Sequence, residues 1–121
     1  LNQAEKYGMT PAYVAAWMGH TAVLALLVKA PGGCDVNQAI VNGSTPAIVA
    51  AHEGHTDALE LLVVKAGCDV NQAEEDGITP AYIAAELGRT AAVELLVKAG
   101  CDVNQAEEVG ATPAYIAAAM G

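Results

Sequence analysis

Short apolar blocks alternate with polar, turn-rich segments along the whole chain, and the alternation is regular. The block TPAYIAAELG at residues 79–88 returns as TPAYVAAWMG at 10–19, TPAIVAAHEG at 45–54 and TPAYIAAAMG at 112–121. Successive Thr-Pro pairs therefore lie 35, 34 and 33 residues apart. A fixed period of about 33 residues predicts a solenoid, in which each unit buries its apolar face against its neighbours.

Residues 71–103 show what one unit contains. The polar segment NQAEEDGITP leads to Thr79, which suits a helix N-cap, and to Pro80, which suits the first helical position because its missing N–H is not needed there. The apolar letters AYIAAEL then predict a short helix that runs to Gly88, a plausible C-terminal stop.

A second helix follows in the same unit. The letters TAAVELLVKA predict a helix that closes at Gly100, with Lys98 in its last turn opposing the helix dipole. The pair Asp76-Gly77 supplies a tight turn between units. Each unit is therefore predicted to be two short antiparallel helices and a projecting loop.

Two insertions explain why the first two intervals exceed 33 residues. The segment KAPGGC carries two residues more than KAGC, and LELLVVKAG carries one more than VELLVKAG. We interpret the shortest interval as the parent period.

The unit resembles the ankyrin repeat, whose pattern is DxxGxTPLHxAAxxGHxxxVxxLLxxGADVN. The resemblance implies an all-α repeat fold (an α-solenoid), a stack of antiparallel helix pairs with projecting β-turn or hairpin loops. It implies a single domain over 1–121, with repeats at about 2–36, 37–70 and 71–103 and a partial repeat at 104–121. The residues that fall in register are Gly77, Thr79, Pro80, Ala84, Ala85, Gly88, Leu95, Leu96, Gly100, Asp102, Val103 and Asn104.

The chain departs from that pattern after Thr-Pro, where the family's Leu-His is Ala-Tyr in three repeats and Ala-Ile at Ala47-Ile48. In the family this His resembles a buried hydrogen-bonding strut between repeats. A Tyr could fill the space and direct its hydroxyl to a backbone carbonyl, whereas Ile48 can only pack. The family's Ala before the loop Asp is Cys34, Cys68 or Cys101, which we expect to be small buried replacements with free thiols.

Charge and hydropathy narrow the classes of partner. Fourteen acidic against five basic side chains give a net charge of −9, which opposes binding to nucleic acid or to an anionic membrane. No apolar run approaches the roughly 20 residues that a bilayer needs, and no signal-peptide pattern opens the chain. With free thiols expected, we predict an intracellular, cytoplasmic location.

Catalytic and metal chemistry finds little support. The HEGH segment places His52 and His55 three residues apart, but Gly54 breaks the helix that would aim both rings together. The acidic segments AEEDG (73–77) and AEE (106–108) lack the oxygen spacing of a calcium loop, so we interpret them as solvated loop tips. The NGS sequon at 42–44 is interpreted as chance. We expect no enzyme, no cofactor and no metal.

The resemblance instead implies a partner-binding groove formed by the loop tips and the first-helix face. Its N-terminal positions hold the only Trp, a Tyr and Met residues, and its later positions are acidic, which predicts a partner protein or peptide with an apolar residue beside Lys or Arg. The candidate residues are Lys6, Tyr7, Met9, Trp17, Met18, Val41, Asn42, Ser44, His52, Glu53, Glu75, Asp76, Ile78, Glu86, Leu87, Glu108, Val109, Ala111, Ala119 and Met120.

Two other interpretations stay open beside the protein-interaction module. The chain could be a structural spacer in a longer ankyrin array, since it starts inside a loop and stops after one helix, or an engineered scaffold without a natural partner. The irregular insertions argue against design. We expect a monomer, with end-to-end stacking of uncapped ends as the alternative.

Overall fold

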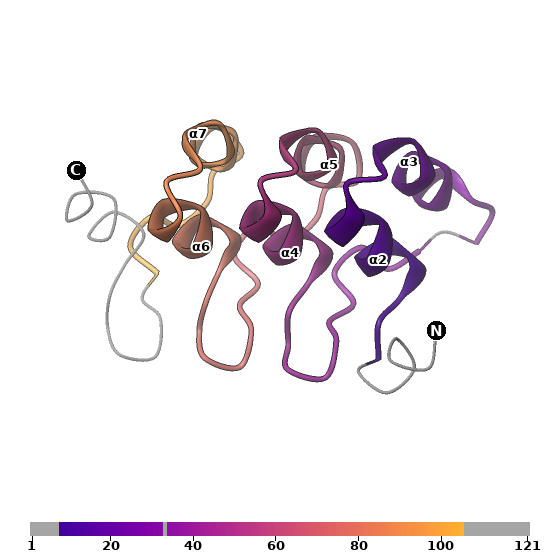
Figure 1. The fold of residues 1–121 in the computed structure, drawn as a ribbon, viewed down its shortest axis with the longest axis horizontal. Coiled ribbons are helices and arrows are strands. Elements are labelled where there is room, and N and C mark those ends of the chain that lie inside the picture. The colour runs from indigo at the N-terminus through magenta and orange to yellow at the C-terminus, as the bar shows by residue number, and fades with distance from the viewer. Residues whose placement is uncertain (1–7, 33, 106–121) are drawn as a thin grey trace.

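Six α-helices stand in two rows in the computed structural model, which describes residues 8–32 and 34–105. Figure 1 shows the first helices of the three repeats (α2, α4, α6) in one row, the second helices (α3, α5, α7) in the other, and loops that project from one side. The predicted all-α repeat fold is confirmed, and the residues described contain no strand. The helices are α2 (Pro11–Met18), α3 (Thr21–Lys29), α4 (Pro46–Glu53), α5 (Thr56–Glu60), its π-helical continuation η1 (Leu61–Lys65), α6 (Pro80–Glu86) and α7 (Thr90–Lys98).

Each first helix begins at the predicted threonine cap. The hydroxyl oxygen of Thr10, Thr45 and Thr79 accepts from the backbone N–H three residues on, at 3.1, 3.2 and 3.1 Å. A proline follows each cap at the start of the helix. Because the cap satisfies a free N–H and the proline has none, the Thr-Pro pair fixes where each unit starts.

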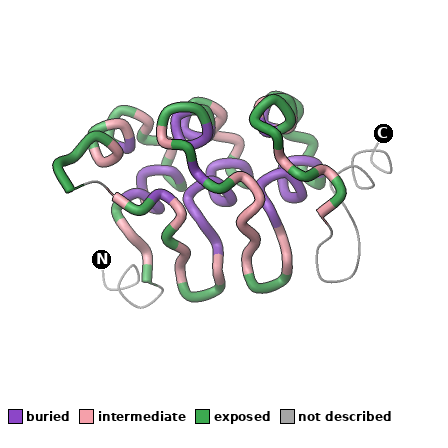
Figure 2. Tube along the Cα trace, turned by 180° about the vertical axis from the view of Figure 1, so that it is seen from behind, coloured by how far each residue is buried: buried purple, intermediate pink, exposed green. Residues whose placement is uncertain are grey.

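The core consists of small and aliphatic side chains. Alanines of the first helices, such as Ala16, Ala50 and Ala84, are fully buried, so α2, α4 and α6 pack directly on one another. The second helices contribute buried leucines, including Leu59 and Leu96. Figure 2 shows the buried residues concentrated in the row of first helices, between exposed loop tips and the partly exposed second helices. Close helix contact is possible because the side chains between the helices are short.

The one-residue insertion in the second repeat is absorbed inside a helix. After Glu60 the helix widens into the π-helix η1, in which Leu61, Leu62 and Val63 stay buried and Val64 is 65% exposed. A π-turn accommodates one extra residue without moving the helix on either side. The leucines therefore keep the same place in the core as their equivalents in α7.

The loops contact one another as well as their own helices. The N–H of Gly43 donates to the carbonyl of Ile40, and that of Gly77 to the carbonyl of Glu74, each at 2.9 Å. The predicted Asp76-Gly77 turn is thus confirmed. Between neighbouring loops, the N–H of Glu75 donates to the carbonyl of Asn42 at 3.0 Å.

A hydrogen-bonded ladder joins the bases of the loops, where DVNQ recurs at 35–38, 69–72 and 102–105. The Asn37 side chain accepts from the N–H of Asp69 at 2.8 Å, and Asn71 accepts from the N–H of Asp102 at 2.7 Å. The side-chain amide of the next repeat's Gln also donates to each Asn carbonyl. Each Asn therefore links its own repeat to the following one.

The predicted burial of the cysteines holds for only one of them. Cys68 is buried, whereas Cys34 and Cys101 are partly exposed, and all three thiols are free. Burial, followed by the charge of Asp69, raises the pKa of the Cys68 thiol to about 11. Of the three cysteines, Cys68 is the one most shielded from water.

Within residues 8–32 and 34–105, no helix is both long enough and apolar enough to cross a bilayer.

Candidate partner-binding surface

A hollow of about 510 Å³ opens where the loops meet the first helices, and it extends over three repeats. Helices α2, α4 and α6 and the loops before them all contribute to it. We call this feature the hollow. Its lining residues are Met9, Tyr13, Trp17, Asn42, Ser44, Ile48, Val49, His52, Glu53, Glu74, Ile78 and Ile83.

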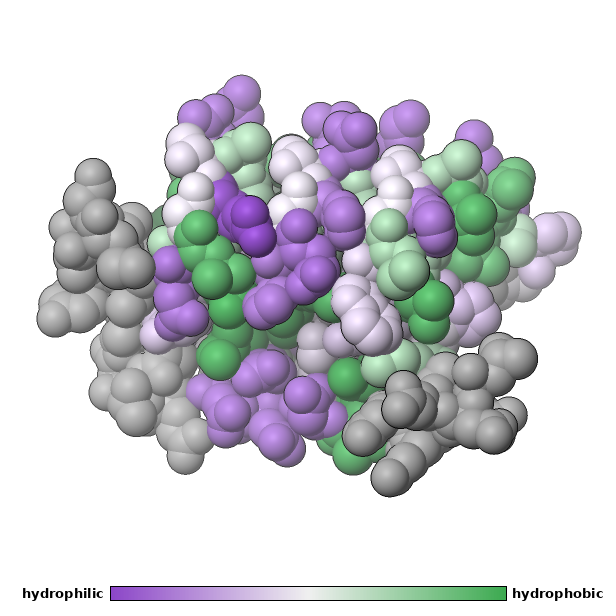
Figure 3. All heavy atoms as spheres, viewed as in Figure 1, coloured by the Kyte–Doolittle hydropathy of each residue, from purple (hydrophilic) through white to green (hydrophobic). Residues whose placement is uncertain are grey.

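The inner part of the hollow is apolar. Tyr13, Ile48 and Ile83 are buried, and Trp17 beside them is 41% exposed. In Figure 3 hydrophilic side chains gather at the tips of the loops, with hydrophobic ones beside and above them. A partly open apolar recess with a few polar groups is typical of a binding site.

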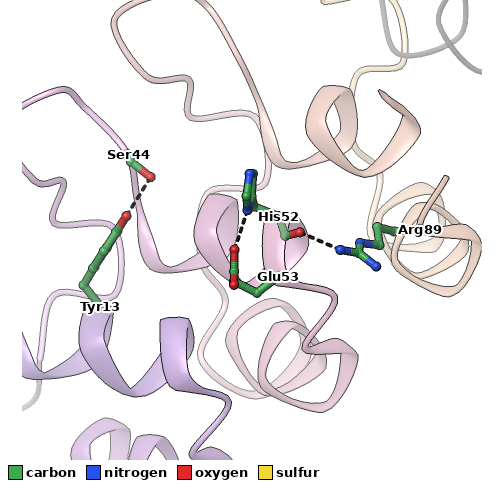
Figure 4. Close-up of polar contacts among 5 residues, drawn as sticks. All are labelled: Tyr13, Ser44, His52, Glu53 and Arg89. Carbon is green, nitrogen blue, oxygen red and sulfur yellow. Dashed lines mark hydrogen bonds and ion pairs between the residues drawn. The ribbon is translucent and has the colours of Figure 1, made fainter. Parts of the chain in front are cut away.

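The first junction between repeats is spanned by a tyrosine. The Tyr13 hydroxyl donates to the Ser44 hydroxyl oxygen at 3.3 Å in a buried contact (Figure 4). Burial raises the pKa of Tyr13. The expectation of a backbone carbonyl partner was wrong for Tyr13, because Ser44 places a side-chain oxygen nearer to the hydroxyl. Ile48, one repeat on, is buried and packs in the core as expected.

Acidic groups border the hollow. Glu53 contacts the Nδ1 of His52 at 2.5 Å, and Glu74 lies in the loop opposite (Figure 4 shows the first pair). Burial, and then the charges of Asp76 and Glu75, raise the pKa of Glu74. The interpretation of 73–77 as a solvated tip therefore fits the exposed Glu75 and Asp76, whereas Glu74 is partly covered. None of the lysines and arginines that the structure describes lines the hollow; they are Lys29, Lys65, Arg89 and Lys98.

The predicted site residues fall into three groups. Seven of them line the hollow: Met9, Trp17, Asn42, Ser44, His52, Glu53 and Ile78. Six are described but lie outside its lining: Met18, Val41, Glu75, Asp76, Glu86 and Leu87. The others, Lys6, Tyr7, Glu108, Val109, Ala111, Ala119 and Met120, lie outside the described residues.

Comparison with known protein families bears on this geometry. A family model of ankyrin repeats in three copies matches residues 49–121, and a single ankyrin repeat model matches residues 7–40. The chain belongs to the ankyrin repeat family. No curated protein matches it. Ankyrin repeats are generally interaction modules without enzymatic activity.

Five residues that line the hollow were not among the predicted site residues, and all five were missed for the same reason. Tyr13, Ile48, Val49, Glu74 and Ile83 belong to the ankyrin frame or to the inner side of the loop, positions that suggest packing alone. The available signal was the Tyr-to-Ile change at residue 48, which alters a position that the other repeats keep.

A separate polar pocket of about 300 Å³ lies at the turns between the paired helices. Packing between neighbouring ankyrin repeats shapes this pocket. A Cβ built on Gly19 would lie 2.7 Å from the His55 ring, and one on Gly54 would lie 3.1 Å from the Arg89 guanidinium. Arg89 also donates to the carbonyl of His52 at 3.0 Å (Figure 4). The described residues contain no group of three or more side chains arranged to hold a metal ion.

Proposed function

We propose that this ankyrin chain binds a partner protein or peptide through the hollow and the loop tips beside it. One observation carries the proposal, namely an apolar recess that three repeats share and that carboxylates border. Such a recess favours a partner segment with an apolar side chain next to Lys or Arg, since the apolar group leaves water while the cation faces Glu53 and Glu74.

The rim extends the proposal beyond the hollow. Met18, Val41 and Leu87 are 55%, 74% and 42% exposed, and Glu75, Asp76 and Glu86 are exposed as well. Large apolar side chains on the same surface as acidic ones can extend contact with a partner without being needed by the core. We propose that these residues form the outer part of the interface, and that the chain acts as a monomer.

A pair of variants tests the proposal. Trp17→Ala removes the largest partly exposed side chain of the hollow, and Leu26→Ala removes an apolar side chain that is 71% exposed on α3, away from the hollow. Each purified variant is used to capture proteins from a cell lysate, after circular dichroism shows that it folds. A partner identified with the parent chain should be lost with Trp17→Ala and kept with Leu26→Ala.

The proposal fails if the captured partner is retained equally by both variants, because the contact then lies elsewhere. It also fails if crosslinks to the partner map to the second helices and spare the hollow.

A further inference from the structure

We propose that Ile48 is the specificity-determining residue of the hollow, and that it leaves room for one aliphatic side chain of a partner peptide followed by Lys or Arg. The inference rests on the proposed function and deepens it, since it names the position that selects the bound side chain.

The argument begins with two equivalent junctions in the stack. Between repeats one and two, the ring of Tyr13 bridges the junction and its hydroxyl meets Ser44. Between repeats two and three, Ile48 and Ile78 hold the same positions in the repeat and also line the hollow. An isoleucine is too short to bridge as tyrosine does and has no hydroxyl to place. The second junction is therefore the one without a bridging ring.

Aliphatic groups form the floor of the second junction. Ile48 and Ile83 are 4% and 8% exposed, so both are held in place by the core, and Ile78 is half-buried at the loop side. A wall of fixed branched side chains selects by shape and volume. It accepts an aliphatic group that completes the packing, and it offers no hydrogen bond to a polar one.

The charges beside this floor favour a basic residue next to the aliphatic one in the partner. Glu53, which contacts His52, approaches from α4 and Glu74 from the facing loop, and no described lysine or arginine lines the hollow. A cation of the partner within reach of both carboxylates forms hydrogen bonds assisted by charge. A partner residue with a carboxylate at that place is repelled. The occupant is thus a peptide segment in which an aliphatic residue adjoins Lys or Arg.

The chain supplies the variant that tests this. The double substitution Ile48→Tyr, Ile78→Ser places the same residue pair as Tyr13–Ser44 at the second junction. We expect this variant to fold, because the first junction already accommodates such a pair. Leu26→Ala changes an exposed side chain on α3, outside the lining of the hollow, and is the control. Ile48→Val deepens the floor by one methyl group and is the milder variant.

The probe is a random peptide library displayed on phage, selected on the parent chain. We expect enriched peptides to share an aliphatic residue next to Lys or Arg. We expect the Ile48→Tyr, Ile78→Ser chain to bind them about tenfold to a hundredfold more weakly, the discrimination that apolar pockets achieve for small changes of volume. Leu26→Ala should bind them as well as the parent chain. Ile48→Val should shift preference toward the larger aliphatic residues.

Failure of the inference differs from failure of the proposed function. If the enriched peptides bind the Ile48→Tyr, Ile78→Ser chain as tightly as the parent chain but lose affinity for Trp17→Ala, the surface binds peptides and Ile48 does not select them. The same conclusion follows if Ile48→Val leaves the preference unchanged. If no peptide is enriched, or if Trp17→Ala has no effect, the proposed function and the inference both fall.

Discussion

Gly43 lies where its loop closely approaches the loop of the next repeat. Its φ is +88°, and a Cβ at this residue would lie 2.9 Å from the backbone nitrogen of Glu75. We expect Gly43→Ala to lower the free energy of unfolding by about 2–3 kcal/mol, since it adds left-handed strain and a backbone clash. Urea denaturation followed by circular dichroism measures the change.

Gly32 is the matched control for Gly43. Its φ is +85°, and among the described residues other than its chain neighbours no atom lies within 4 Å of a Cβ built there, so Gly32→Ala adds the strain without the clash. We expect it to cost about 1–2 kcal/mol. Equal losses for the two substitutions would show that the loop contact is unimportant.

The Cys68 thiol makes stability depend on pH in the alkaline range. Its pKa is raised from the ordinary 9.0 to about 11, so between these values the folded chain keeps a proton that the unfolded chain has lost. The contribution is fully present below pH 9 and falls as the pH rises, by up to about 3 kcal/mol in total. The difference in free energy of unfolding between the parent chain and Cys68→Ala, measured by urea denaturation from pH 8 upward, should shift in that direction.

The comparison of the parent chain with Cys68→Ala isolates the effect of the thiol, because every other titrating group is common to both chains. A difference that stays constant from pH 8 to the alkaline end would mean that the thiol is not shielded in the folded state.

Residue-level predictions succeeded where the cause is local. Thr79 caps its helix through a hydrogen bond three residues along the chain, so the sequence alone determines it. Glu74 and Ile48 line the hollow but were not among the predicted site residues, because their surroundings come from neighbouring repeats. A sequence pattern within one repeat does not show which side chains the next repeat covers.

At the scale of elements, deletion of one residue from η1 tests whether this π-helix only accommodates an extra residue. Removing Val64 restores the letters LVKAG that α7 has, and takes away a residue that is 65% exposed. We expect η1 to become α-helical and the free energy of unfolding to stay equal or to rise, because the buried residues Leu61–Val63 keep their places. Denaturant unfolding of the shortened chain measures this.

Deletion of Val97 from α7 is the control, because α7 has no extra residue to lose. There the deletion breaks the helical register that links the body of α7 to its end. We expect a loss of about 1–3 kcal/mol, since the deletion displaces the end of the helix from the partly buried Cys101 that follows it. If deletion of Val64 costs as much as deletion of Val97, η1 is not a passive accommodation of the extra residue.

Some features of the helices and loops could not be predicted from the sequence pattern. The extra Val at 63–64 was evident from the spacing, and the helix pair around it was predicted. That the residue enters a π-turn inside the helix, rather than a longer loop after it, depends on the packing of Leu61 and Leu62 against the stack. The loop ladder was likewise missed, since Asn37 finds its partners in another repeat.

For the whole molecule, the net charge of −9 predicts a dependence of stability on salt. Self-repulsion of the carboxylates opposes the compact state, and it is screened as the Debye length falls from about 30 Å at 0.01 M to about 8 Å at 0.15 M. We expect the thermal unfolding midpoint to rise over this range of NaCl concentration, as measured by circular dichroism.

The double variant Glu75→Gln, Asp76→Asn, compared with the parent chain, tests this explanation of the salt dependence. Both side chains are exposed next to Glu74, so removing their charges should raise the midpoint at low salt and flatten its dependence on salt. A salt dependence that is as steep in this variant as in the parent chain would place the repulsion elsewhere.

The Asn ladder has a consequence for how such a chain can change its length over generations. Asn71 receives the backbone N–H of Asp102, while the N–H of Asp69 in the same segment is given to Asn37 of the preceding repeat. Each segment thus carries a donor facing one way and an acceptor facing the other. A duplicated whole unit arrives with both halves of the connection, so insertion of one repeat leaves every bond of the ladder made, whereas gain or loss of a fraction of a unit does not.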